Sequence, residues 1–302
     1  MATVGGRPAG LRRLLPRRAL LTVTVLAVLV AGVVVLDDRR ATAGGPTAAE
    51  VVPAVVAAYG SEGTLAVVVA RQQLPFAGLP LRGLEARRAR VAASSADNGA
   101  VASRPFPTAS LVKLFVAEDI LHRARAGLLT LTPDDVDLLG QMIRRSDDGA
   151  ASTLWVRYGG AGMVSDVAAR YGLTGTAPPL SPGQWGETTT TARDLARFLS
   201  LLPVVAHPVD AAMVLGWMRE ATPVAADGFD QQFGLFGIAP PRTPVKQGWM
   251  CCVDGNRHLH SVAVIGHQVV VLLSEVPQSV SYAAASAALD AAAAALPPPP
   301  HL

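Results

Sequence analysis

Lysine is almost absent from this chain. Of its 26 lysine and arginine residues, only Lys113 and Lys246 are lysines, which leaves 24 arginines. Aromatic residues are also scarce, at 5% of the sequence, and no stripe of arginines alternates with aromatic side chains. Part of the formal net charge of +3 comes from the first forty residues, so it does not indicate a basic binding surface. These features argue against a nucleic-acid-binding protein.

Cysteine is limited to the adjacent pair Cys251 and Cys252. A chain of 302 residues can bury a core without disulfides. Neighbouring Cα atoms lie about 3.8 Å apart, below the usual disulfide range of about 4.4–6.8 Å. We therefore expect one buried and one more exposed thiol, with a vicinal disulfide as the alternative. His258 and His260 would share one face of a strand, but no cysteine or carboxylate set accompanies them, so we expect no metal and no cofactor.

The N-terminal region combines a basic segment, 1–18, with an uncharged apolar run, 19–36. Eighteen residues of helix cover about 27 Å, close to the thickness of a bilayer core. The five arginines before the run predict that residues 1–18 are cytoplasmic and that the chain after residue 36 is exported. We interpret 19–36 as a retained single-pass anchor. The alternative is a signal peptide cleaved near residues 41–43, which would release a secreted protein.

Residues 47–296 are predicted to form one domain, between a linker at 37–46 and a proline-rich tail at 297–302. Hydrophobic periodicity predicts the following elements. They are a helix at 47–59, strands at 64–70 and 90–95, helices at 110–126, 133–145, 147–158, 161–171, 191–201 and 208–220, strands at 243–252, 258–265 and 268–275, and a helix at 279–296. This order predicts a sheet whose two end helices pack together, with a helical block inserted midway.

The first lysine follows a serine in the string S-L-V-K. Residues three apart on a helix share a face, so Lys113 can reach the hydroxyl of Ser110. Where arginine is the default cation, a lysine suggests a task that requires losing a proton, which arginine cannot do. Burial and repulsion from a second cation such as Lys246 would lower the pKa of Lys113. The spacing therefore predicts Ser110 as a nucleophile and Lys113 as its base.

Two further strings contain candidate site residues. The string S-D-D at 146–148 begins a predicted helix, where these residue types are also typical of simple N-terminal caps. The string K-Q-G-W at 246–249 lies on a predicted strand, where a glycine permits close approach of a ligand backbone. No G-x-S-x-G nucleophile elbow is present.

These three strings, in this order, resemble the S-x-x-K, S-D-N and K-T-G motifs of the penicillin-recognising serine enzymes, the class A β-lactamases and D,D-peptidases. The predicted element order over 47–296 is similar to theirs, and the threonine run at 188–191 resembles the one after their omega loop. The resemblance implies an α/β (α+β), β-lactamase-like fold. In it, an antiparallel sheet flanked by terminal helices carries an inserted all-helical subdomain, here preceded by one transmembrane helix.

The resemblance also implies roles for single residues. Ser110 would be the nucleophile, Lys113 its base and Ser146 a proton shuttle toward the leaving group. Lys246 would attract a substrate carboxylate, and the backbone N–H groups of Ser110 and Trp249 would form the oxyanion hole. The other substrate-binding positions are Asp148, Gln247 and Gly248.

Three departures from the family pattern bear on activity. The interval 167–186, where class A enzymes have the glutamate that activates the deacylating water, contains no Asp or Glu. A penicilloyl-enzyme should therefore persist. Asp148 replaces an asparagine, and an ionised carboxylate would hold Lys113 protonated. Gln247 replaces a serine or threonine, and we expect its longer side chain to narrow the cleft, beside a stacking surface from Trp249.

The sequence thus predicts a membrane-anchored, extracytoplasmic acyl-serine hydrolase that acts on a cell-envelope peptide or ester, foremost a peptidoglycan stem peptide. We expect a monomer with a small-molecule or peptide substrate, poor β-lactamase activity and no nucleic-acid partner. A class A-like β-lactamase and a non-catalytic envelope-binding scaffold that kept the fold are the alternatives. Labelling by a serine-reactive probe would separate the enzymes from the scaffold.

Overall fold

The computed structural model describes residues 47–74 and 83–298. The predicted basic segment 1–18, span 19–36 and linker 37–46 lie outside the described residues, as does most of the predicted tail. Within the described ranges, no helix is both long and apolar enough to cross a membrane.

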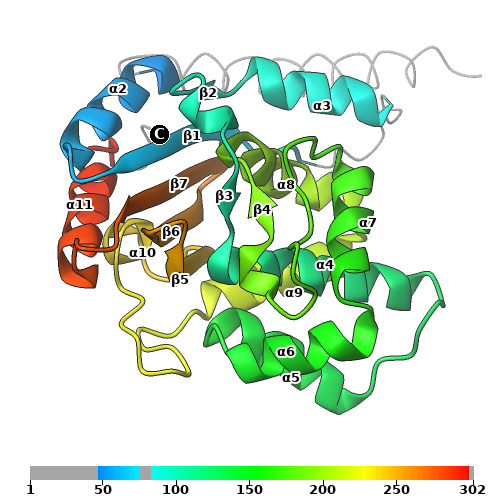
Figure 1. Ribbon diagram of the computed structural model, residues 1–302. Coiled ribbons are helices and arrows are strands. Elements are labelled where there is room, and N and C mark those ends of the chain that lie inside the picture. Colours follow the sequence, from blue (N-terminus) through cyan, green and yellow to red (C-terminus); the bar gives the residue numbers. More distant parts are fainter. Residues whose placement is uncertain (1–46, 75–82, 299–302) are drawn as a thin grey trace, which may run out of the picture. The chain divides into compact units, whose positions relative to one another are not determined.

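A five-stranded antiparallel sheet forms the centre of the fold, with the strand order β2-β1-β7-β6-β5 (Figure 1). The strands are β1 (Thr64–Arg71), β2 (Ala96–Asp97), β5 (Val245–Val253), β6 (Asn256–Ile265) and β7 (Gln268–Pro277). Strands β1 and β7 are buried along nearly their whole length, which explains their runs of valine and leucine. Strand β5, with the K-Q-G-W string, lies at the edge of the sheet.

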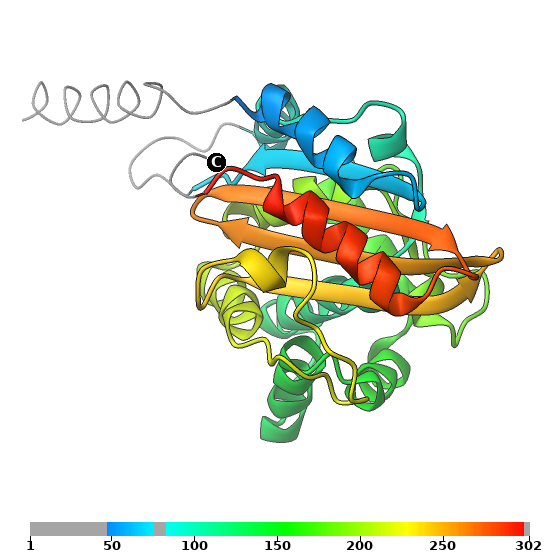
Figure 2. The ribbon, with the colours of Figure 1, turned by 90° about the vertical axis from the view of Figure 1, so that its left-hand side faces the viewer.

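The two end helices, α2 (Ala48–Tyr59) and α11 (Tyr282–Ala294), cover one face of the sheet and lie side by side (Figure 2). Helix α2 begins with a capping box between Thr47 and Glu50. Its apolar side packs with α11 and the sheet in one core, which includes Val67 and Leu289. The predicted pairing of the end helices is confirmed.

The inserted helices lie on the opposite face (Figure 1). They are α4 (Val112–Arg125), α5 (Pro133–Arg144), α6 (Asp148–Tyr158), α7 (Ala161–Tyr171), α8 (Ala192–Val205) and α9 (Pro208–Arg219). Helix α4 is buried from Val112 to Leu121, and the ring of Phe115 packs on Phe198 with centroids 5.0 Å apart. The short elements are η1 (Val101–Ser103), β3 (Phe106–Pro107), η2 (Ala109–Leu111), η3 (Trp185–Glu187), β4 (Thr189–Thr190) and α10 (Leu235–Ile238). The helical block thus holds the start of α4 against the sheet.

The predicted strand at 90–95 is wrong. Residues 90–93 of this stretch belong to helix α3 (Leu84–Ala93). The strand that pairs with β1 in this region is β2, whose two residues lie opposite Val68 and Val69. Most residues of the segment L-E-A-R-R-A-R-V-A-A are strong helix formers, and Val91 is its only buried residue. The short string 90–95 fits a strand when it is taken alone, but the strong helix formers before it decide its structure. The other predicted elements are present, with ends shifted by a few residues.

Candidate active site

Ser110 and Lys113 meet where η2 leads into α4. Lys113 Nζ lies 2.8 Å from Ser110 Oγ, and both side chains are buried, Lys113 completely. The three-residue spacing places them on one face of the helical turn. An unprotonated Lys113 in this position can accept the proton of the Ser110 hydroxyl.

The backbone is strained at two positions in this site. Ala109 has a φ of +46° and Ser146 a φ of +51°, in the left-handed region that residues with a side chain rarely adopt. Such conformations persist only where the surrounding structure imposes them, and they are frequent at active sites. One of the two residues precedes the candidate nucleophile, and the other is the candidate proton shuttle.

Gly248 allows β5 to pack closely against η2. A Cβ atom at position 248 would lie 3.0 Å from the backbone O of Thr108 and 3.3 Å from Leu111 Cγ. The glycine therefore permits the approach of the turn that carries Ser110, in addition to any approach by a ligand. The close packing fixes the position of Ser110 relative to β5.

Ser146 lies between the two lysines. Lys246 Nζ donates a hydrogen bond to Ser146 Oγ at 2.8 Å, and Lys113 Nζ donates to the backbone O of Ser146 at 2.6 Å. Lys113 Nζ is also 3.4 Å from Ser146 Oγ. These contacts connect Ser110, Lys113, Ser146 and Lys246 in one network, along which a proton can be relayed.

Only one of the two aspartates at the start of α6 is a helix cap. Asp147 Oδ1 accepts a hydrogen bond from Ala150 N at 2.9 Å, which is the ordinary N-cap interaction. Asp148 Oδ1 instead accepts from Lys113 Nζ at 2.6 Å. The Asp148 side chain is 62% exposed, whereas the lysine that it contacts is fully buried. Asp148 therefore faces both the lysine and the solvent.

Burial dominates the electrostatics of the site. It lowers the pKa of Lys113, and the charges of Asp148, Asp147 and Asp227 offset only part of this effect. Burial also lowers the pKa of Lys246 well below its usual range, and repulsion from Lys113 adds to the decrease. An amine with a lowered pKa is more readily unprotonated and can act as a base.

We expect Asp148→Asn to accelerate acylation of Ser110 by an activated ester about two- to fivefold at pH values below the pKa of Lys113. Acylation requires unprotonated Lys113, so its rate rises with pH through that pKa. The Asp148 charge raises the pKa of Lys113, and its removal should shift the rising limb to lower pH. The factor corresponds to ~0.5–1 kcal/mol for an ion pair whose carboxylate is largely exposed to solvent.

The measurement is the acylation rate between pH 5 and pH 9, followed by intact mass. Asp134→Asn, in the first turn of α5, changes the same charge outside the site and should leave the profile unchanged. An equal or lower rate for Asp148→Asn across the range would refute the role assigned to Asp148.

Gln247 and Trp249 point to the other side of β5, because side chains alternate along a strand. Gln247 is buried, its Nε2 donates to the backbone O of Phe233, and its Oε1 accepts from Ser261 Oγ at 2.9 Å. Gln247 therefore does not narrow the cleft as expected, because neighbouring segments engage both ends of its amide. The Trp249 ring stacks on Phe229 with centroids 4.6 Å apart, so it packs within the fold.

The expectation of two free thiols is also wrong, since Cys251 and Cys252 form a disulfide. That expectation assumed regular alternation of side chains, which a bulge between Cys251 and Val253 interrupts. His260 has a structural contact: its Nε2 lies 2.7 Å from the backbone O of Pro107, three residues before the nucleophile. Burial lowers the pKa of His260 to about 3, so its ring is neutral.

Sequence reasoning missed two residues near Lys113. The ring centroid of Trp185, in η3, lies 4.9 Å from Lys113 Nζ. Asp227 raises the pKa of Lys113 and accepts a hydrogen bond from Trp249 Nε1 at 3.3 Å. A usable signal was the tryptophan near the end of the interval 167–186, just before the threonine run.

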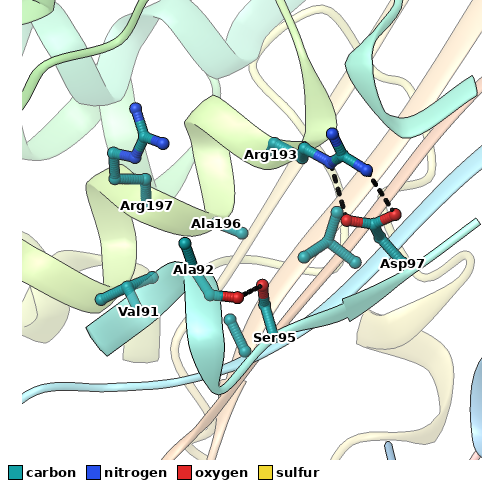
Figure 3. A pocket seen from close by; sticks show the side chains of 9 residues that line it. Val91, Ala92, Ser95, Asp97, Arg193, Ala196 and Arg197 are labelled. Carbon is teal, nitrogen blue, oxygen red and sulfur yellow. Dashed lines mark hydrogen bonds and ion pairs between the residues drawn. The ribbon is translucent and has the colours of Figure 1, made fainter. Parts of the chain in front are cut away.

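A separate pocket of about 300 Å³ lies between α3, the β1–β2 edge and α8 (Figure 3). Arg193 forms a two-point ion pair with Asp97 there, at 2.7 and 2.8 Å. Val91 and Ala196 contribute apolar walls. None of the lining residues belongs to the Ser110 network, so a substrate in this pocket would not contact the candidate nucleophile.

The fold of the described residues is β-lactamase-like. The structure is similar to a β-lactamase from Chitinophaga pinensis, with a TM-score of 0.59 and 13% identity over 80% of this chain and 96% of that one. A β-lactamase from Sphaerobacter thermophilus has a TM-score of 0.59 and 18% identity, over 81% of this chain and 94% of that one. An ancestral class A β-lactamase has a TM-score of 0.58 and 18% identity, over 81% of this chain and 98% of that one. These likenesses confirm the predicted β-lactamase-like fold.

Sequence relatives are found in mycobacteria. Proteins of Mycobacterium tuberculosis and Mycobacterium bovis with the name "Putative lipoprotein LppW" are 40% identical to this chain over 188 residues. The match covers 60% of this chain and 59% of each relative, so it spans about three fifths of their length. No protein-family model matches the chain.

Proposed function

We propose that this chain is an extracytoplasmic acyl-serine hydrolase of the D,D-peptidase type, which acts on a peptide or ester of the cell envelope. The observation that supports it most directly is the 2.8 Å contact between Ser110 Oγ and the Nζ of the buried Lys113, in a β-lactamase-like fold. A lysine whose pKa is lowered by burial can act as a base, and its position beside a serine hydroxyl suits nucleophilic catalysis.

In the proposed reaction, Ser110 Oγ attacks the substrate carbonyl carbon and Lys113 accepts the hydroxyl proton. The backbone N–H groups of Ser110 and Trp249 donate hydrogen bonds to the developing oxyanion. The bond from carbon to the leaving nitrogen or oxygen then breaks, and the leaving group takes a proton relayed through Ser146. The product of this half-reaction is an ester between Ser110 and the acyl group.

Lys246 would bind a carboxylate of the substrate. Within the described residues, no carboxylate lies within ion-pair distance of its Nζ, which hydrogen bonds to Ser146 Oγ and, at 2.7 Å, to the backbone O of Gln247. Burial disfavours the charged form of Lys246, and a substrate carboxylate beside its Nζ would favour that form and offset part of the cost. This preference agrees with a peptide that ends in a free carboxylate.

Two alternatives have specific support. The fold is shared with β-lactamases, although the interval 167–186 lacks a carboxylate to activate water, so we expect β-lactam turnover to be poor. A non-catalytic envelope-binding scaffold is favoured only by the Asp148 contact with Lys113. For localisation, the name of the mycobacterial relatives supports association with the envelope, and the predicted span at 19–36 would be the anchor of this chain.

The test is incubation of the full chain with a penicillin and, separately, with an activated ester. We expect one covalent adduct per chain in the intact mass, mapped to Ser110 by peptide fragmentation. The penicillin adduct should outlast removal of free penicillin, because hydrolysis is slow. Many turnovers of penicillin would favour the β-lactamase, and no adduct from either reagent between pH 5 and pH 9 would favour the scaffold.

A further inference from the structure

The amine of Lys113 is enclosed on all sides. Its Nζ lies within hydrogen-bond distance of Ser110 Oγ, the backbone O of Ser146 and Asp148 Oδ1. The face of the Trp185 ring covers it at 4.9 Å, and the lysine side chain has no exposed surface. The Trp185 ring therefore occupies the side of the amine that faces η3.

The Trp185 ring is held in place from two directions. Its Nε1 donates a hydrogen bond to Ser152 Oγ, on α6, at 3.2 Å. The segment around it is tied to the turn that carries the nucleophile: Thr108 N donates to the backbone O of Thr188 at 2.7 Å, and Thr108 Oγ1 to that of Gly186 at 3.5 Å. The half-buried ring therefore has a fixed position relative to Ser110 and Lys113.

We propose that Trp185 is a positioning residue that keeps water away from Lys113 and so makes the acyl-enzyme on Ser110 long-lived. The proposal rests on the proposed function, because it concerns the fate of that ester. Hydrolysis requires a base near the ester: the water oxygen bonds to the acyl carbon, the bond from carbon to Ser110 Oγ breaks, and the water's proton passes through the base to Oγ. The interval 167–186 contains no Asp or Glu, and Lys113 Nζ lies 2.8 Å from Ser110 Oγ, so Lys113 is placed to serve as that base.

This arrangement affects acylation and hydrolysis differently. In acylation, Lys113 accepts the proton of Ser110 across a 2.8 Å contact that needs no water. In hydrolysis, water must first approach Lys113, where the ring lies. Trp185 therefore slows the second half-reaction while leaving the geometry of the first intact. The longer-lived ester has more time to meet an acceptor other than water.

The first test compares deacylation of the Ser110 ester in wild type, Trp185→Ala and Trp185→Phe. We expect Trp185→Ala to deacylate at least tenfold faster, because the open space admits water to Lys113. Trp185→Phe retains an aromatic face and should stay within about threefold of wild type. The control is Trp217→Phe on α9, which changes a tryptophan that packs against the helical core and should leave the rate unchanged.

The pH profile of acylation distinguishes shielding of Lys113 by Trp185 from a purely structural role, because a structural role would leave this profile unchanged. Burial is the main cause of the lowered pKa of Lys113, so water entry in Trp185→Ala should raise that pKa. The rising limb of acylation should then shift to higher pH. At neutral pH the variant should acylate more slowly and deacylate faster, a pair of opposite changes that general loosening of the fold would not produce.

A second test does not depend on catalysis. The chain has only two lysines, so reductive methylation with formaldehyde and a hydride donor can be counted by mass, with the N-terminal amine as an internal standard. We expect both lysines to be unreactive in wild type. In Trp185→Ala, Lys113 should become methylated while Lys246 stays protected.

The two tests separate the possible failures. If wild type forms no acyl-enzyme, the proposed function fails, and methylation still decides whether Trp185 shields Lys113. If Ser110 is acylated but Trp185→Ala deacylates at the wild-type rate, the inference is overturned and the proposed function stands. Equal methylation of Lys113 in wild type and Trp185→Ala would also overturn it.

Discussion

Replacing Ser110 with alanine is expected to abolish the covalent adduct with both penicillin and an activated ester. The adduct is an ester of the Ser110 hydroxyl, and alanine has no group that can replace it. Lys113 retains its contacts with the backbone O of Ser146 and with Asp148 in the variant, so the network that holds α4 and α6 together is largely preserved. The loss should therefore be chemical, with little effect on folding.

The measurement is intact mass after the same incubation, together with the thermal unfolding midpoint. Ser103→Ala is a suitable control, because Ser103 is an exposed serine seven residues earlier with no lysine three positions further on. It should form the adduct at the wild-type rate. An adduct of normal yield on Ser110→Ala would show that another residue is the nucleophile.

Replacing Lys113 with methionine should lower the rate of Ser110 acylation by about 10²–10⁴-fold, the usual contribution of a general base. Methionine has a similar length and shape, so Ser110 should keep its position. The substitution removes a buried amine that is costly to charge, and removing one partner of an ion pair is destabilising mainly where the other partner is left buried. Asp148, which loses its partner, is 62% exposed and can be solvated. We therefore expect reduced acylation without reduced stability.

Acylation of Lys113→Met is followed by mass over minutes to hours, and stability by denaturant unfolding. Lys246→Met is the matched comparison, because it also removes a buried lysine, but one that we assign to substrate binding. Acylation of this variant should be slower than in wild type and should recover at higher concentrations of a carboxylate-bearing reagent. The assignment of the base would be wrong if Lys113→Met acylated as fast as wild type. Unfolding of this variant would instead contradict the expected stability.

The central residues of the candidate site could be predicted because their signals are local. Ser110 and Lys113 are three residues apart on a helical turn, and the rarity of lysine distinguished both Lys113 and Lys246 from ordinary surface cations. The structure brings both lysines to Ser146, and Ser110 to Lys113. The overall fold was equally accessible, since its long helices and buried strands have strong periodic patterns.

The remainder depended on contacts between distant segments. The orientation of Gln247 follows from Phe233 and Ser261, which lie on other elements and could not be placed beforehand. Trp185 reaches Lys113 from a segment that is hydrogen bonded to Thr108 and Ser152, on distant parts of the chain. The stretch 90–95 differs, because local helix propensity and not a distant contact decides its structure. The residues that show this propensity lie just before the stretch.

Burying two lysines links the stability of the protein to proton binding. Both amines have lowered pKa values in the folded state and return to the ordinary lysine value when the chain unfolds. Between those values the unfolded chain binds more protons than the folded one, so the free energy of unfolding should increase as pH rises through this range. The same two side chains that prepare the site for catalysis therefore weaken the fold at neutral pH, and the rest of the domain must compensate for that loss.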